Sequence, residues 1–517
     1  MSSIYKNPNE QTDQFVTLEK TIERYQKALN KREEWESHWQ ECYDYALPQR
    51  GSIRRGLSRG GKRMQHLFDG TASDAVDQLA ASLLGNLTPP WTGWFGLKPG
   101  YDLSNSEAEA IAPVLEKATR TMQAHFDNSN FAVEAHQCFL DLAVGGTASL
   151  TFEETHAGSL SAFKFSAVPL NDIVLEEGEK GFLDVSYRSL TLSEEQLKER
   201  YGLENVDSKS KQDEDYSIIE VIEPKAGGYQ FSAILMDEQT PVLLKEGQFS
   251  SSPVISFRWT KSPSEDYGRS PVMKALPDIK TANKVVELIL KNASIAVTGI
   301  WQADDDGVLN PANINLVPGA IIPKAVGSNG LKPLEMPGRF DVSELVLSDL
   351  RNRIRHALLV DKMGAISNRR MTATEVLERA NEMALLLGAT YGRLQSEFLN
   401  PLIQRAYSIL KRRGEIPDLL LDGRTVALEY RSPIARAQAQ KGIQNTLTWI
   451  ETVLSMGADA GESVDKRRAA QFLGEALGVP SDLINRDTAE NDFSLSDLPI
   501  VDLAAATGDF TGDVDVQ

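Results

Sequence analysis

The sequence has 517 residues, of which 41% are apolar and 25% are charged, an ordinary globular composition with enough length for several domains. Its net charge of −19 argues against a protein that wraps nucleic acid in a basic surface, although it leaves room for one that lets DNA slide past. The two cysteines, Cys42 and Cys138, lie far apart, which argues against a disulfide framework or a zinc site and fits a reducing compartment such as a cytoplasm.

The first part of the chain is expected to be helical. Apolar residues recur at helical spacing over residues 17–46, and a second helix follows with Ser73 as its N-cap and Pro89–Pro90 as its end. Two more helices are expected near residues 105–127 and 131–143. Between the first two helices lies a basic, glycine-rich stretch with six cations: Arg50, Arg54, Arg55, Arg59, Lys62 and Arg63. We interpret this stretch as a flexible surface segment, with contact to DNA or to a neighbouring subunit as the alternative.

From Ala148 to about Trp259 the pattern changes to short β-branched and aromatic runs, such as "SAFKFSAVP" and "YSIIEVIEP", broken by glycine and proline. This pattern predicts a mostly antiparallel sheet. The predicted fold class is therefore α+β and helix-rich. Trp91, Trp94 and Phe95 are interpreted as buried anchors.

The next region predicts two antiparallel helices with a compact β module at their far end. Ser270 can cap the first helix, and Pro271 suits its first turn. The apolar face of this helix is expected to contain Leu276, Ile279, Asn283, Val286, Leu290, Ala293 and Val297. Residues 298–338 contain five prolines and six glycines, which favours short strands and turns. The second helix is expected at about 341–360.

A very long helix is expected over residues 372–413, where it would span roughly 60 Å if it were continuous. Thr372 and Glu375 form a capping box at its start. The residues expected to bend it are Gly388, Gly392 and Pro401. After this helix, residues 434–484 have a helical pattern. The tail from Asp487 to Gln517 holds eight acids and no lysine or arginine, so we expect it to be disordered.

No pattern in the chain is typical of an active site. "GLSRGGKR" at Gly56–Arg63 resembles a phosphate-binding loop, but Arg63 stands where a serine or threonine should hold magnesium. Asp304, Asp305 and Asp306 lack the alternating spacing of a calcium loop. The histidines show no metal-binding spacing either. We therefore expect no enzyme activity, no cofactor and no metal, and the absence of a long apolar run predicts no membrane span.

Three motifs and their order resemble the portal, or head-to-tail connector, proteins of short-tailed bacteriophages. The motifs are "DYGRSP" at Asp266–Pro271, "RMTATEVLERANE" at Arg370–Glu382 and "DGTASDAVDQLAASLLGNLTPPWTGWFGL" at Asp69–Leu97. The likeness runs from about residue 15 to 480. It implies a ring of about twelve copies around a channel at one capsid vertex.

The resemblance also implies a division of the chain. In chain order the stretches would be the wing 1–265, a stem helix 266–297, the clip 298–338, a second stem helix 339–360, a channel loop 361–371, the long inner helix with its return to the wing 372–432, a helical crown 433–484 and the acidic tail 485–517. Nothing is implied about the role of the tail.

The implied function is mechanical. The ring would dock the large subunit of the terminase motor at the clip, conduct double-stranded DNA inward without reading its sequence, retain it, join the tail adaptor and nozzle proteins, and conduct the DNA out at ejection. Major capsid and scaffolding proteins would be further partners. The implied location is the virion, at the portal vertex, with assembly in the host cytoplasm.

A ring gives the basic residues before the long helix a role. Arg369 and Arg370 precede a helix N-terminus, which disfavours cations by roughly 0.3–1 kcal/mol. Together with Lys362, copies of these residues would form a basic collar that touches DNA phosphates at any rotation. The alternative is that they are solvated residues before a helix. Arg351 and Arg355 are further channel candidates, which face either the lumen or the acids of a neighbour.

In the proposed clip, Trp301 and the acids Asp304, Asp305 and Asp306 are candidates for a partner surface, because aromatic residues are enriched at interface hot spots. A place for Trp301 in a local core is an equal alternative. Two rival functions remain open: an enzyme of DNA packaging, such as a nuclease or ATPase, and a long-helix scaffold that forms no ring. Hydrolysis assays and images of the purified particle would separate the three.

Overall fold

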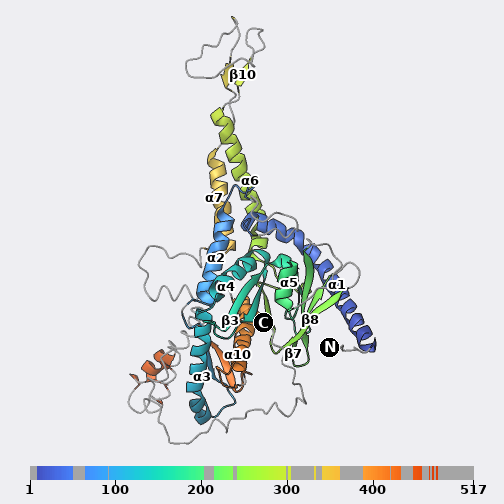
Figure 1. Ribbon diagram of the computed structural model, residues 1–517. Coiled ribbons are helices and arrows are strands. Elements are labelled where there is room, and N and C mark those ends of the chain that lie inside the picture. Colours follow the sequence, from blue (N-terminus) through green and yellow to red (C-terminus); the bar gives the residue numbers. More distant parts are fainter. Residues whose placement is uncertain are drawn as a thin grey trace.

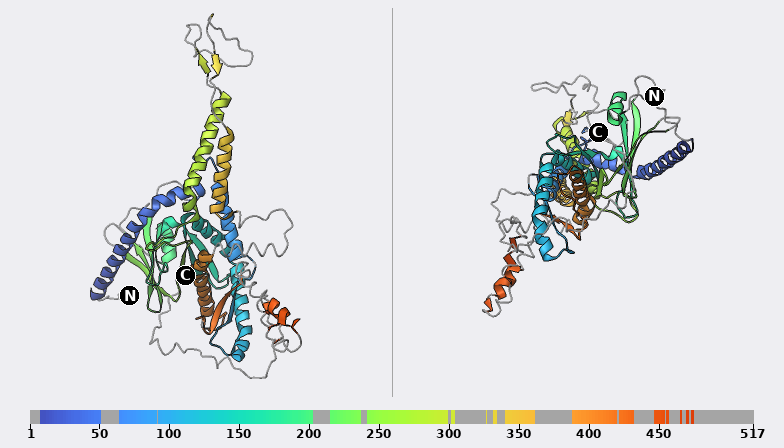
Figure 2. Two further views of the ribbon diagram at one scale, coloured as in Figure 1. Left: turned by 180° about the vertical axis from the view of Figure 1, so that it is seen from behind. Right: turned by 60° about the horizontal axis from the view of Figure 1, so that its bottom comes forward.

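A body with a long projecting pair of helices is the main feature of the computed structural model (Figure 1). The residues that it describes are 8–50, 64–90, 92–202, 215–236, 241–298, 301–303, 326, 331–333, 340–360, 388–419, 421–431, 446–453, 455–456, 465, 469–470 and 473–474. The left view of Figure 2 shows the same projecting pair from behind, with the body at its base.

Four helices begin the chain: α1 (Pro8–Ala46), α2 (Thr71–Leu87), α3 (Asn105–Asp127) and α4 (Phe131–Gly145). Helix α4 is the centre of the body, since every residue from Cys138 to Gly145 is buried. A helical segment that is buried on all sides is expected to be apolar on all sides, and Asp141 is the single charged residue in the run "CFLDLAVG". It contacts α2, β2, β3, α1 and α6.

Two antiparallel sheets form the β part of the body. The first has the order β3-β2-β9 and the second the order β4-β5-β6-β7-β8. Their strands are β2 (Thr147–Glu154), β3 (Phe163–Val168), β4 (Ile173–Glu176), β5 (Val185–Leu192), β6 (Tyr216–Lys225), β7 (Gly228–Leu235), β8 (Val242–Phe249) and β9 (Val254–Arg258). A short helix, α5 (Glu194–Tyr201), follows β5 and was not expected from the sequence.

Helices cover both faces of the five-stranded sheet. Side chains alternate between the faces of a strand, so neighbouring residues go to different cores. Ile219 packs with Tyr25 of α1 on one face. Ile218 packs with Leu197 and Tyr201 of α5 on the other face.

A third pairing joins distant parts of the chain at the edge of the body. Strand β1 (Phe95–Pro99) pairs antiparallel with β12 (Val426–Tyr430), with Phe95 opposite Tyr430. Helix α3 packs on β1. Trp94 and Phe95 are buried, as the sequence predicts, whereas Trp91 lies outside the described residues.

The projecting pair consists of α6 (Pro271–Thr298) and α7 (Phe340–Ala357), which we call the stem (Figure 1). The two helices pack on each other along the stem. At its far end β10 (Trp301–Ala303) pairs antiparallel with β11 (Leu331–Pro333). The expected arrangement of helix, small β module and helix is therefore present.

The C-terminal half of the expected long helix is described from Gly388 onward. It is helical from Gly388 to Leu394, forms a π-helical turn at Gln395–Leu399 and continues as α10 (Asn400–Arg412). Pro401 has no backbone N–H to donate to the carbonyl of Glu397, so an irregular turn directly before it has a physical cause.

Three details differ from the predictions. Helix α1 begins at Pro8 rather than at residue 17. Helix α2 begins at Thr71 with Gly70 at its N-cap, so the expected cap at Ser73 is wrong. The carboxylate of Asp69 accepts a hydrogen bond from Thr71 N (3.0 Å) and already satisfies that free N–H group. Leu290 was expected on a core face, yet its exposed fraction is 52%.

Candidate functional site

The base of the stem is held against the body by the side chain of Asn283, which is buried on α6. Its Oδ1 accepts hydrogen bonds from the backbone N–H groups of Phe68 (2.6 Å) and Asp69 (3.1 Å). Its Nδ2 donates to the carbonyl of His66 (2.9 Å). One amide thus satisfies three backbone groups of the segment that leads into α2, which explains a polar residue on the buried face of α6.

An ion pair fixes the same segment to α7. Arg351 donates through Nε to Oδ2 of Asp69 (2.9 Å), and its Nη2 lies 2.8 Å from the same oxygen. Burial raises the pKa of Asp69, but the hydrogen bonds from Thr71 and Arg351 have the larger total effect and leave it below its ordinary value. Arg351 therefore has a partner in its own chain, which neither of the expected roles foresaw. Arg355 is exposed and forms no ion pair with another described residue.

The loop that enters the stem passes close to the body. Gly146 has a φ of +77°, and a Cβ atom at this position, as in any other residue, would lie 2.3 Å from the carbonyl oxygen of Gly268. Gly268 N donates to the hydroxyl of Thr147 (2.8 Å). Ser270 Oγ donates to the carbonyl of Val144 (2.8 Å) and accepts from Met273 N (2.9 Å), so its expected N-cap role is present. The motif "DYGRSP" thus serves as an attachment of the stem.

A buried arginine joins this entry loop to the inner helix. Arg258 is fully buried, and its guanidinium donates to Glu397 (2.8 Å), to Glu177 (2.9 Å) and to the carbonyl of Asp266 (3.0 Å). Glu397 lies in the π-helical turn, and Glu177 also pairs with Lys261. Buried charges persist only when they are paired, so this group ties three separate segments together.

A second buried carboxylate holds the start of the basic stretch. Asp141 of α4 pairs with Arg50 (2.7 Å) and accepts a hydrogen bond from the hydroxyl of Tyr43 (2.8 Å). Burial raises the pKa of Asp141 to about 6, despite the opposing effect of the Arg50 guanidinium. The rest of the basic stretch, residues 51–63, lies outside the described residues.

Several predicted site residues are also outside the described part of the chain. These are the channel candidates Lys362, Arg369 and Arg370, the capping residues Thr372 and Glu375, and the clip acids Asp304, Asp305 and Asp306. Trp301 lies on β10, opposite Pro333 of β11, at the far end of the stem. The structure thus gives Trp301 an element and a position, and the roles of the whole set remain predictions.

The stem exposes apolar side chains, including Leu290, which the sequence pattern predicts on the apolar face of α6. The exposed fractions are 49% for Leu288 and 52% for Leu290 on α6, and 74% for Leu345 and 46% for Val346 on α7. Leu288 and Leu290 are two residues apart, which is roughly 200° around a helix, so they point to different sides of α6. A single copy of the stem therefore leaves apolar surface open on more than one side.

Within the described ranges, no group of three His, Cys, Asp or Glu side chains could hold a metal ion. None of the helices in those ranges is long and apolar enough to cross a membrane. Cys42 and Cys138 are free and buried.

Comparisons with known proteins find a matching family model and relatives over most of the chain. A family model described as "Bacteriophage head to tail connecting protein" matches residues 18–484. The probable portal protein of Bordetella phage BPP-1 is 26% identical over 513 residues, covering 92% of this chain and 89% of that protein. The portal protein of Salmonella phage epsilon15 is 26% identical over 504 residues, covering 90% and 88%. A chain in a solved virion of a native gene transfer agent particle aligns with a TM-score of 0.38 at 12% identity, covering 80% of this chain and 94% of that one.

Proposed function

The chain belongs to the bacteriophage head-to-tail connecting proteins, and we propose that it closes into a ring of about twelve copies around a channel for DNA. Its function is that of a portal protein, the connector between the head and the tail of a phage. The family model matches residues 18–484 of the chain. The rival interpretations, a packaging enzyme and a scaffold that forms no ring, have no comparable support.

The observation that supports a ring is the apolar surface of the stem. Leu288 and Leu290 of α6 and Leu345 and Val346 of α7 are all exposed on one projecting pair of helices, and an exposed group of apolar side chains can mark a protein–protein contact. In a cyclic ring every copy meets one neighbour on each side through two different surfaces. A stem placed between two copies can therefore make apolar contacts on both sides, through Leu288 and Leu290 of α6.

Each stretch of the chain would form a different region of this ring. In our proposal residues 1–265 form the wing, α6 and α7 form the stem, and the β10–β11 hairpin belongs to the clip. Residues 361–371 form the channel loop, residues 372–413 the inner helix and residues 433–484 the crown. The attachments at Asn283, Arg258 and Asp69 support this division, because they are the points where stem, wing and inner helix meet.

DNA would meet the ring mainly at the channel loop. Copies of Lys362, Arg369 and Arg370 would form a basic collar, and the net charge of −19 would keep the remaining surface from holding the phosphates. Arg355 is a further candidate, since it is exposed and forms no ion pair within the described residues. Arg351 is a weaker candidate, because its guanidinium is already bonded to Asp69. Such contacts carry no sequence information.

The proposed partners follow from the position of a connector. The clip, with Trp301 and Asp304–Asp306, would meet the large terminase subunit during packaging and the tail adaptor and nozzle proteins afterwards. The wing and crown would meet the major capsid and scaffolding proteins. The protein would then reside at the portal vertex of the virion after assembly in the host cytoplasm. Its role is mechanical: retention of the genome and its passage in and out.

Imaging of the purified full-length chain tests the ring. We expect negative-stain images to show annular particles with a central hole, and light scattering to give a mass of about twelve chains. Particles that stay monomeric or dimeric under every assembly condition would contradict the proposal. The collar has its own test: Arg369→Ala with Arg370→Ala should leave rings intact and alter DNA packaging or retention. Unchanged packaging and retention in that variant would remove the collar and leave the ring.

A further inference from the structure

The outer face of α6 carries a leucine between two lysines. Lys284, Leu288 and Lys291 recur at spacings of four and three residues, so they form one stripe. Leu288 is two residues after Val286, which packs against the core, and therefore points roughly 200° away from it. Lys284 and Lys291 both pair with the single carboxylate of Glu287, at 3.0 and 2.5 Å. Two cations share one anion, so the stripe keeps a positive charge.

The outer face of α7 carries a leucine beside two acids. Leu345 is two residues before the buried Leu347, so it points roughly 200° away from the α6–α7 contact. Asp349 is one helical turn further along the same face, whereas Glu344 is roughly 100° around the helix from Leu345 and lies at one edge of that face. Both acids are exposed, and neither forms an ion pair within the described part of the chain. This face is therefore apolar at its centre and negative at its rim.

The two outer faces lie at the same height on the stem. Arg353 of α7 pairs with Asp278 of α6 (2.8 Å), which fixes the register of the two antiparallel helices. Lys284 and Lys291 are six and thirteen residues from Asp278 toward the tip, and Glu344 is nine residues from Arg353 in the same direction. Because both helices rise by about 1.5 Å per residue, Glu344 falls between the two lysines in height.

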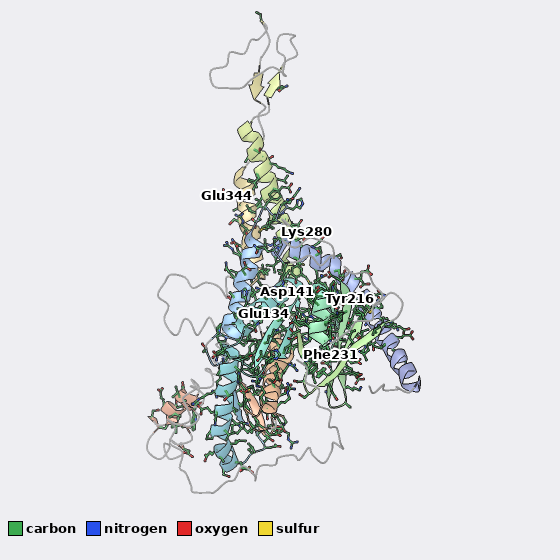
Figure 3. The ribbon with its side chains drawn as sticks, in the orientation of Figure 1. Glu134, Asp141, Tyr216, Phe231, Lys280 and Glu344 are labelled. Atoms are coloured by element: carbon green, nitrogen blue, oxygen red, sulfur yellow. The ribbon has the colours of Figure 1, made fainter. Side chains whose placement is uncertain are left out.

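A cyclic ring brings equal heights of neighbouring copies together, since it has no rise along its axis. We propose that the outer face of α6 in one copy packs against the outer face of α7 in the next, with Leu288 against Leu345 and the α6 lysines against Glu344 and Asp349. Figure 3 places Glu344 on the α7 side of the stem and Lys280 on the α6 side. The inference rests on the proposed ring and names the two surfaces that close it.

The outer faces of α6 and α7 are complementary in charge, which supports a contact between them in neighbouring copies. Each outer face offers an exposed leucine, 49% for Leu288 and 74% for Leu345, with charges of opposite sign around it. An apolar centre with a charged rim is the usual composition of a protein interface. The surfaces differ from one another, so the contact is head-to-tail and can be repeated around a ring.

Charge reversal tests the pairing. K284E/K291E alone should place acids against acids, and E344K/D349K alone should place cations against cations. We expect the ring fraction, measured by sedimentation and negative-stain imaging, to fall about tenfold or more for each variant. An equimolar mixture should restore rings of alternating chains, because both kinds of contact are then attractive. The four substitutions in one chain should restore them as well.

The control is K20E/K27E, which reverses two exposed lysines one heptad apart on α1, and it should assemble as the unmodified protein does. Normal rings from K284E/K291E alone would overturn the inference while leaving the proposed ring intact. So would failure of the mixture to assemble when each variant remains folded by circular dichroism. Absence of rings from the unmodified chain would instead overturn the proposed function, and this inference with it.

Discussion

The body and the stem differ in how completely they bury their apolar side chains. In the body, Phe257 and Phe398 are fully buried, with ring centroids 4.4 Å apart, and they belong to one continuous core. In the stem, Leu290 and Leu345 leave half or more of their surface in water. Figure 1 shows the same contrast in shape, with a layered body below and a bare pair of helices above.

This difference separates a region whose core is formed within one chain from a region that leaves apolar side chains exposed. In the body, the buried charges of Arg258 and Glu397 are paired within the same chain. The stem is attached to the body at its base through Asn283 and Asp69, yet it exposes apolar side chains along its length. Changes in the body should therefore alter the stability of each chain, whereas changes along the stem should alter assembly.

The largest effect is expected from Arg258→Met. The substitution leaves Glu397, whose exposed fraction is 5%, as a buried charge without its main partner. We expect the free energy of unfolding of the dilute monomer to fall by about 3–5 kcal/mol in urea titrations. R258M/E397L removes both charges and should recover a large part of this loss. A double variant no more stable than R258M would contradict the pairing.

A pH effect of intermediate size is expected from Asp141. Its pKa in the folded protein is about 6, above the ordinary value of 3.8, so the folded state holds this proton more tightly than the unfolded state. Its contribution to stability is therefore greatest below about pH 4, falls by roughly 1–3 kcal/mol as the pH rises to 6, and is level above that. Urea titrations between pH 4 and 7 should show this fall relative to Asp141→Asn. Parallel pH profiles for the two proteins would contradict it.

A smaller effect is expected where the body meets the stem. Ser270→Ala removes the N-cap of α6, whose hydroxyl accepts from Met273 N and donates to the carbonyl of Val144. We expect a loss of about 0.5–2 kcal/mol in the unfolding free energy of the monomer. Ser270→Thr keeps the hydroxyl and should retain most of the stability. Equal losses for both variants would show that the cap is not the cause.

The smallest effect on stability is expected in the stem itself. Leu345→Ser should change the unfolding free energy of the monomer by less than about 0.5 kcal/mol, because the side chain is already exposed. It should nevertheless raise the protein concentration needed to form rings. Val133→Ser, at a 65% exposed position on α4, is the matched control and should alter neither property. A clear loss of monomer stability with L345S would remove the contrast between the two regions.

Much of the fold follows from the sequence, since local signals determine it. Helix α3 has the expected bounds, Ser270 caps α6, and the alternating runs form antiparallel strands. The apolar pattern of α6 shows the limit. Spacing predicts that Leu290 has a partner, but it does not say whether that partner is in the same chain. The structure leaves Leu290 exposed, in a region that a neighbouring copy can cover.

The attachments between regions were not predictable in the same way. Arg258 and Glu397 are 139 positions apart, and nothing in either neighbourhood signals the other. The sequence leaves Arg351 open between the lumen and the acids of a neighbouring copy, whereas its partner in the structure is Asp69, in a different part of the same chain. Such pairings depend on how the elements pack. The collar at Arg369 and Arg370 remains a prediction from the order of motifs.

Cysteine cross-linking across the stem tests most directly whether neighbouring copies complete it. Leu288→Cys with Leu345→Cys adds two thiols, while the native Cys42 and Cys138 are buried. Treatment of assembled protein with a short bismaleimide should give a ladder of covalent multimers that ends in a closed ring, and either single substitution should stop at monomers. Intact rings that yield only monomers from the double variant would contradict the account.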